Sequence, residues 1–248
     1  MKKIAAFFDI DGTLVRESIL IKHFKKLVKY GIIDEVHWAR TIRPKYEAFE
    51  RRYGDFDDYL DEVSSVYKEK LVGLHKSLID FTAQQVIDEG GEMVYRYTRN
   101  MIKYHKSQGH LVFFISGSPD FLVSKLADRY GITDYRGTNY RFDEDDIFRG
   151  DISQMWDSAS KEREFKAIAE KYDIDLASSY AYGDTNGDYS MLKAMGHGVA
   201  MNPSEKLLHM IRDDEKLLDK VDIIIERKDV IYKVKADVET IPTYFKAE

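Results

Sequence analysis

The feature that most limits the possible folds is a series of short apolar runs separated by longer helical patterns. A short apolar run suits a strand that is buried on both faces, and its alternation with helices favours a parallel sheet. The sequence therefore predicts an α/β fold with a doubly wound parallel sheet. The expected strands are residues 4–8, 111–115, 180–182, 198–201 and 221–225.

The gap between the first two expected strands is too long for one crossover helix. Residues 16–89 are charged throughout and carry apolar residues at helical spacing, such as Leu20, Phe24 and Leu27. We expect an inserted helical cap there, with residues 1–15 and 90–248 forming the core. Gly90 and Gly91 then break the pattern, as a hinge or as a simple loop, before a helix expected over residues 92–107.

The rest of the chain predicts a helix over residues 120–130, a hairpin from 135–142 and 147–152, and a helix over 160–172. The segment from Arg227 onward has mixed signals, and no element is assigned to it.

Composition excludes several classes of protein. The net charge is −6 without a Lys/Arg-rich run, which argues against a nucleic-acid partner. There are no cysteines, so thiolate chemistry is absent and a reducing cytoplasm is the expected location. Only five apolar residues follow Lys3, too few for a secretory signal, and no run reaches the length of a membrane helix. The oligomeric state is not predictable from these features.

Two carboxylates, Asp9 and Asp11, follow the first expected strand, and Gly12 and Thr13 come directly after them. Open α/β sheets place ligand sites at the carboxyl ends of strands. Two acids so close repel each other, so a divalent cation or a shared proton must stabilise them. Thr13 offers a hydroxyl that can fix a carboxylate. The same residues also fit a strand that ends in an ordinary Asp–Gly turn, and these residues alone do not separate the two interpretations.

Ser116 and Gly117 follow the second expected strand and precede a helix. A hydroxyl and free backbone N–H groups at that place suit an anion such as phosphate. An ordinary helix cap is the alternative interpretation.

Two further groups extend the acidic site. Asp184 follows the strand at 180–182, and Asp188 comes one helical turn later. With Asp9 and Asp11 they would gather four oxygen ligands of the kind that Mg²⁺ prefers. Lys161 lies near the start of a helix, where a cation is unfavourable, so it either projects into the site or is a solvated surface lysine.

These motifs together resemble the haloacid dehalogenase superfamily. Its four motifs appear in order as residues 9–13, Ser116, Lys161 and residues 183–188. The segment 181–196, residues 199–203 and the helical insert look like the phosphoserine phosphatase-like branch in particular. The resemblance covers about residues 1–226 and implies a Rossmann-like core with a helical cap between motifs one and two.

The resemblance also implies roles for the site residues. Asp9 would be the nucleophile that becomes an aspartyl-phosphate, and Asp11 would be the general acid and base. Mg²⁺ would be held by Asp9, Asp184 and the backbone carbonyl of Asp11, with Asp188 orienting the ligands. Ser116, Gly117 and Lys161 would hold the phosphoryl oxygens.

The function that follows is Mg²⁺-dependent hydrolysis of a small phosphorylated metabolite, with phosphoserine as one candidate substrate. A phosphotransferase or mutase on the same scaffold is the alternative, and a non-enzymatic receiver module is a third hypothesis that the large insert disfavours. Glu17 is a candidate contact for a substrate amine, with a surface glutamate as the simpler interpretation. Tyr46, Phe49 and Tyr53 share a helical face and fit either a leaving-group pocket or packing within the cap.

Overall fold

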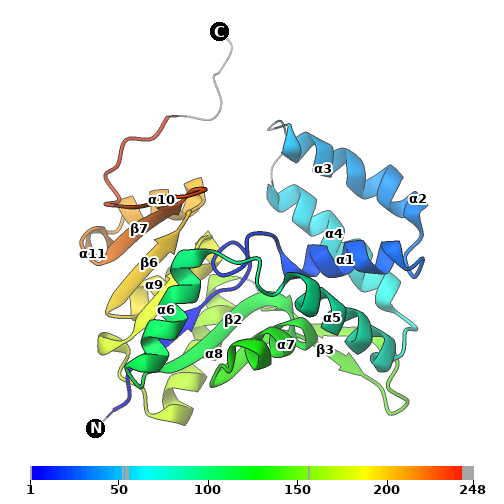
Figure 1. The fold of residues 1–248 in the computed structure, drawn as a ribbon, viewed down its shortest axis with the longest axis horizontal. Coiled ribbons are helices and arrows are strands. Elements are labelled where there is room, and N and C mark those ends of the chain that lie inside the picture. Colours follow the sequence, from blue (N-terminus) through cyan, green and yellow to red (C-terminus); the bar gives the residue numbers. More distant parts are fainter. Residues whose placement is uncertain (1, 52, 54–55, 156, 242–248) are drawn as a thin grey trace.

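The computed structural model describes residues 2–51, 53, 56–155 and 157–241 (Figure 1). In that part of the chain, eight strands form one sheet in the order β4-β3-β2-β1-β5-β6-β7-β8. The strands are β1 (Ala5–Phe8), β2 (Leu111–Pro119), β3 (Asp134–Phe142), β4 (Phe148–Ser153), β5 (Tyr180–Gly183), β6 (His197–Met201), β7 (Val221–Glu226) and β8 (Ile231–Val234).

Neighbouring strands from β3 to β7 in this order pair in parallel, whereas the edge strands β4 and β8 are antiparallel. The predicted α/β class, the five predicted strands and the β3–β4 hairpin are therefore confirmed. Strand β8 lies in the segment for which the sequence assigned no element. It forms because residues 231–234 pair with the exposed edge of β7.

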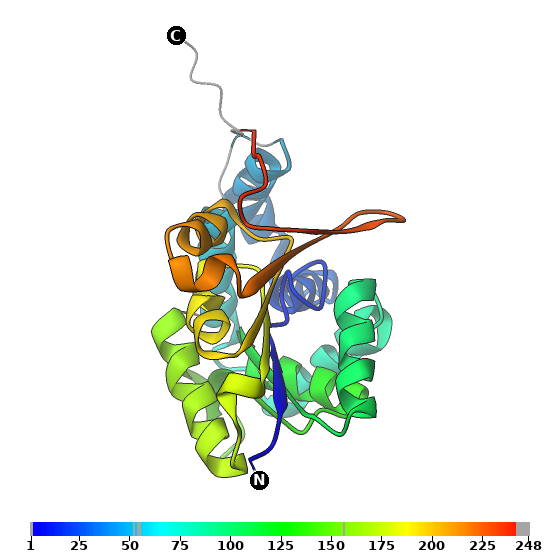
Figure 2. The same cartoon turned by 90° about the vertical axis from the view of Figure 1, so that its left-hand side faces the viewer.

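Alternate residues of β1 enter two separate hydrophobic cores. Ala5 and Phe7 pack with α8 (Ser158–Tyr172), α9 (Tyr189–Ala194), α10 (Glu205–Arg212) and α11 (Glu215–Leu218). Ala6 and Phe8 pack on the other side with α5 (Lys76–Gly90), α6 (Arg96–Ser107) and α7 (Asp120–Tyr130). Figure 2 shows the sheet edge-on, with α6 and α8 on opposite faces. This two-sided burial explains why the strand sequence is apolar at every position.

The helices between β1 and β2 are α1 (Ile19–Lys29), α2 (Glu35–His37), a π-helical turn (Trp38–Ile42), α3 (Arg43–Glu50), α4 (Phe56–Leu71) and α5. The expected apolar stripes are buried here, and their side chains are continuous with the core on the α5 face of the sheet. His23 joins three helices, because its ring nitrogens bond to the hydroxyls of Tyr67 on α4 (2.6 Å) and Thr82 on α5 (2.7 Å). Each fully buried large apolar side chain stabilises this arrangement by roughly 1.5–3 kcal/mol.

Two predicted boundaries were wrong. The strand expected to end at residue 115 continues to Pro119, because Thr138 pairs beside Pro119 and donates to the Gly117 carbonyl. The helix expected from residue 92 begins at Arg96. The preceding residues are extended because Val94 pairs with Val15, which ties the chain leaving the insert to the chain entering it. Within the described ranges, every helix is too short or too polar to cross a bilayer.

Candidate active site

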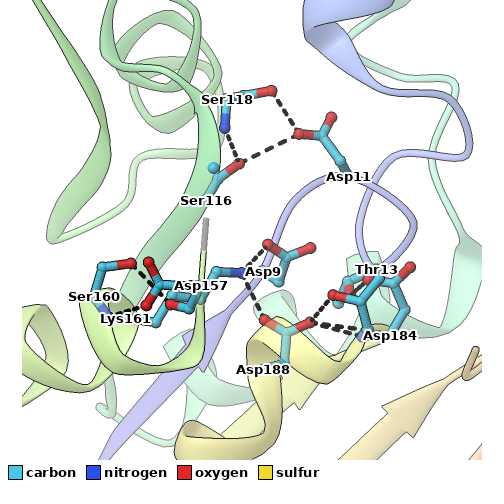
Figure 3. Close-up of polar contacts among 12 residues, drawn as sticks. Asp9, Asp11, Thr13, Ser116, Ser118, Asp157, Ser160, Lys161, Asp184 and Asp188 are labelled. Atoms are coloured by element: carbon cyan, nitrogen blue, oxygen red, sulfur yellow. Dashed lines mark hydrogen bonds and ion pairs between the residues drawn. The ribbon is translucent and has the colours of Figure 1, made fainter. Parts of the chain in front are cut away.

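The carboxyl ends of three neighbouring strands bring the predicted residues to one edge of the sheet. Strand β1 lies between β2 and β5, so Asp9, Ser116 and Asp184 lie next to one another in space although they are remote in the chain. The backbone N–H of Asp9 also donates to the Tyr182 carbonyl, which continues the β1–β5 pairing up to Asp9. Figure 3 shows the resulting cluster of polar side chains.

Lys161 lies inside this cluster and not on the surface. Its side chain is buried, and its Nζ donates to Asp9 Oδ1 (2.7 Å) and to Asp188 Oδ1 (2.6 Å). Asp157 caps the start of α8 by accepting from the Ser160 N–H. Burial lowers the pKa of Lys161, but the charges of Asp188 and Asp9 outweigh it and raise that pKa above its ordinary value. The lysine therefore stays charged.

Asp184 is fixed by two features of the loop after β1. Thr13 Oγ1 donates to Asp184 Oδ1 at 3.0 Å, which is the carboxylate-fixing role expected for that hydroxyl. Gly12 has a φ of +86°, and a Cβ at that position would lie 2.0 Å from Asp184 Oδ2. Only glycine permits both this backbone conformation and the close approach of the carboxylate.

The Asp188 carboxylate, like that of Asp184, is fixed by its hydrogen bonds and by a glycine beside it. Its Oδ2 accepts from the backbone N–H groups of Asp184 and Thr185, each at 3.1 Å. A Cβ on Gly183 would lie 2.3 Å from the Asp188 Cβ, so glycine is needed before Asp184 as well. The loop after β5 thus folds back on itself and points both carboxylates toward Asp9.

Asp9, Asp184 and Asp188 each offer a carboxylate oxygen, and these oxygens lie within 4.8 Å of one another. Burial raises the pKa of Asp9 to about 7 against the opposing charge of Lys161. Burial, with the charges of Asp9 and Asp188, raises the pKa of Asp184 well above its ordinary value. Three acids, of which Asp9 and Asp188 are buried and Asp184 is partly buried, face one lysine. The raised pKa values mean that this lysine does not fully compensate the ionised carboxylates, which is the electrostatic condition that favours a bound cation.

The side chain of Asp11 turns away from this group, toward β2 (Figure 3). Its Oδ2 accepts from the hydroxyls of Ser118 (2.5 Å) and Ser116 (3.4 Å). Its Oδ1 accepts from the backbone N–H of Ile19 (2.7 Å), the first residue of α1. Burial raises the pKa of Asp11, while the hydrogen bonds from Ser118 and Ile19 act in the opposite direction. Asp11 therefore links the sheet to the first helix of the insert.

The structure gathers Asp9, Lys161, Asp184 and Asp188, and places Asp11 and Ser116 in contact beside them. The sequence reasoning missed Ser118, which makes the shortest hydrogen bond to Asp11. Alternation along the strand was the available signal. Because β2 continues to Pro119, Ser116 and Ser118 share one face of it, whereas a loop after residue 115 would not align them.

The candidate substrate contacts lie apart from the acidic cluster. Glu17 is exposed and forms an ion pair with Lys25 at 2.5 Å. Tyr46 and Phe49 pack their rings 5.4 Å and 6.3 Å from the ring of Tyr59, and Tyr53 is exposed. The aromatic pair thus contributes to packing within the insert.

A parallel-dominated sheet with an acidic cluster and a buried lysine at its carboxyl edge defines an α/β protein of the Rossmann-like class with a charged site at the switch between strands β1, β2 and β5. Residues 6–193 match the family model of the haloacid dehalogenase-like hydrolases, and the chain belongs to that family. It is a phosphatase of the phosphoserine phosphatase-like branch, which confirms the resemblance drawn from the four motifs.

Known proteins support this assignment. The phosphoserine phosphatase of Methanocaldococcus jannaschii is 26% identical over 239 residues, which cover 92% of this chain and 95% of that protein. The histidinol-phosphatase of Neisseria meningitidis is 23% identical over 213 residues, covering 83% and 93%. A solved structure of a phospho-aspartyl intermediate analogue of phosphoserine phosphatase has the same fold, with a TM-score of 0.58, 21% identity and coverage of 92% and 96%.

Proposed function

We propose that the protein hydrolyses a small-molecule phosphate monoester with the help of Mg²⁺, through a phosphorylated Asp9. The observation that supports this most directly is the convergence of Asp9, Asp184 and Asp188 around a charged, buried Lys161. A phosphate dianion entering this cluster would be repelled by the carboxylates unless a further cation balanced them.

The residues fit a magnesium ion. Asp9 and Asp184 would hold it together with the backbone carbonyl of Asp11, and Asp188 would orient those ligands. Hard carboxylate oxygens within 4.8 Å of one another are the donor set that Mg²⁺ takes in phosphoryl-transfer sites. When bound, the ion would supply positive charge to the phosphoryl oxygens.

The chain's own residues account for the two chemical steps. A carboxylate oxygen of Asp9 attacks phosphorus, the bond from phosphorus to the leaving oxygen breaks, and Asp11 donates its proton to that oxygen. A water then attacks phosphorus, Asp11 takes back a proton, and the bond to Asp9 breaks to release phosphate. Lys161, the Ser116 hydroxyl and the Gly117 N–H would stabilise the phosphoryl oxygens during both steps.

The helices of residues 16–89 would act as a cap over this site, with residues 1–15 and 90–248 as the catalytic core. The contact between Asp11 and the Ile19 N–H supports this, because the placement of α1 then governs the position of the catalytic acid. The two relatives described above make phosphoserine and histidinol phosphate the first substrates to test.

The test is a panel of phosphate monoesters assayed with Mg²⁺ and with a chelator. Asp9→Asn should abolish turnover, and Asp11→Asn should slow it and leave a phosphoryl group on the peptide that contains Asp9, detected by mass spectrometry. Asp128→Asn is the control, because Asp128 is exposed on α7 and remote from the site. Wild-type turnover by Asp9→Asn would reject the assigned nucleophile, and full activity in chelator would reject the metal. Transfer to added alcohols without free phosphate would favour a phosphotransferase.

A further inference from the structure

A cavity of about 560 Å³ lies beside the two chain segments that connect the helical insert to the sheet. Arg16 and Glu17 line it from the segment that enters the insert, and Met93 and Val94 from the segment that leaves it. The cavity is separate from the acidic cluster, because its lining does not include Asp9, Asp11, Asp184 or Ser116. Its volume is within the range of small-molecule sites in proteins.

The cavity wall comes from both parts of the molecule. Lys22 belongs to α1 of the insert, whereas Arg96 and Arg99 belong to the first turns of α6, which packs on the sheet. Lys228 lies in the turn between β7 and β8. Three separate segments, remote in the sequence, therefore present cationic side chains to one space.

Positive charge in the cavity is not balanced by its own carboxylates. Glu17 is paired with Lys25 (2.5 Å) and Glu92 with Arg129 (3.1 Å), and both of these cations lie outside the lining. Within the lining, Glu92 also lies 4.0 Å from Arg99. These pairs leave the lining with an excess of cations, in a chain whose overall net charge is −6.

Three of the lining cations have no partner of their own. Within the described ranges, Lys22, Arg96 and Lys228 form no ion pair within 4.0 Å. The Nε of Arg99 is buried and has no hydrogen-bond partner there. Burial lowers the pKa of Lys22, and the charges of Glu17 and Asp11 oppose this effect without outweighing it. An anion entering the cavity would satisfy these groups.

We propose that this cavity binds a small polyanion that carries two or more carboxylate or phosphate groups and acts as a regulatory ligand. Arginine side chains bind such groups bidentately, and the two arginines of α6 are one turn apart on the same helix face. The ligand would contact Lys22 of the insert and Arg96 and Arg99 beside the sheet at the same time. Binding would therefore fix the insert relative to the site, where α1 already contacts Asp11.

The test measures binding of tricarballylate, a trianion without phosphorus, by isothermal titration calorimetry at constant ionic strength and without Mg²⁺. Wild-type protein should show saturable binding at one site. The double variant Arg96→Gln/Arg99→Gln should bind at least about tenfold more weakly, equivalent to about 1.4 kcal/mol. Lys103→Gln is the matched control, because Lys103 is an exposed cation of α6 outside the cavity, and its affinity should be unchanged.

A second titration uses protein saturated with orthovanadate, which occupies a phosphoryl site, and tricarballylate affinity should be the same. No saturable binding up to about 10 mM, or equal affinity of the double variant, would overturn the proposal. Competition with orthovanadate would also overturn it, because the anion would then lie in the catalytic site. If the double variant does not fold, Lys228→Gln on the exposed turn serves in its place. The readout is independent of catalysis, so a failed phosphatase assay leaves the result interpretable.

Discussion

Replacing Gly12 with alanine would test whether the position of the Asp184 carboxylate controls activity. The new Cβ would lie 2.0 Å from Asp184 Oδ2, and reaching the 3.4 Å of an ordinary contact requires the carboxylate to move by about 1.4 Å. Displacements of about 1 Å at a reacting centre cost roughly 100-fold in rate. We therefore expect Gly12→Ala to hydrolyse p-nitrophenyl phosphate at least about 100-fold more slowly.

Backbone strain alone must be separated from this displacement. Gly73 is a matched control, because its φ of +88° equals that of Gly12 (+86°) within a few degrees and a Cβ there meets nothing within 4 Å. An L-residue in the left-handed region costs roughly 1–2 kcal/mol in either variant, measured as the free energy of unfolding in urea. Gly73→Ala should lose that stability and keep its activity.

Two results would refute the reasoning. Wild-type activity of Gly12→Ala would show that the Asp184 carboxylate tolerates the displacement, or that it has no part in turnover. An equal loss of activity in Gly73→Ala would show that strain or lost stability, and not the contact with Asp184, explains the effect.

Three further outcomes are expected. Burial lowers the pKa of His23 to about 3, so its contribution to stability is complete above the unfolded pKa of about 6.5 and is lost as the pH falls toward 3. When the pH falls from 7.5 to 5.0, the free energy of unfolding in urea should decrease by about 2 kcal/mol less in His23→Gln than in wild type. An equal decrease in both proteins would contradict this. Ser118→Ala removes a hydrogen bond that lowers the pKa of Asp11. The alkaline limb of the plot of kcat/KM against pH should therefore move to higher pH. A shift of that limb to lower pH would argue against Asp11 as the acid. Lys161→Met leaves the buried carboxylates of Asp9 and Asp188 without their cation and should lower the stability against thermal unfolding by about 3–5 kcal/mol. Added Mg²⁺ should restore part of this stability. An unchanged melting temperature would mean that Lys161 does not form these ion pairs.

Much of the fold follows from local patterns in the sequence. Apolar runs predict the strands because burial on both faces requires apolar residues at every position, as in β1. The length of the insert predicts a separate helical segment, since no single crossover helix needs so many residues. The end of β2 was misplaced because it depends on pairing with Thr138 of the next strand. The start of α6 was misplaced because Val94, just before it, pairs with Val15 on the far side of the insert.

The sequence by itself determined which residue types follow each strand, and therefore that Asp9, Ser116 and Asp184 would meet at one edge of a parallel sheet. The predicted parallel direction of the strands is enough to place all three at the same edge, whereas the order β2-β1-β5, which makes them neighbours, is seen only in the structure. Only the tertiary structure decided how their side chains pair. Lys161 lies between Asp9 and Asp188, and Asp11 turns to Ser118, because side-chain partners are chosen by packing among segments up to 152 residues apart. A local stretch of sequence does not show which distant residue will pack against it.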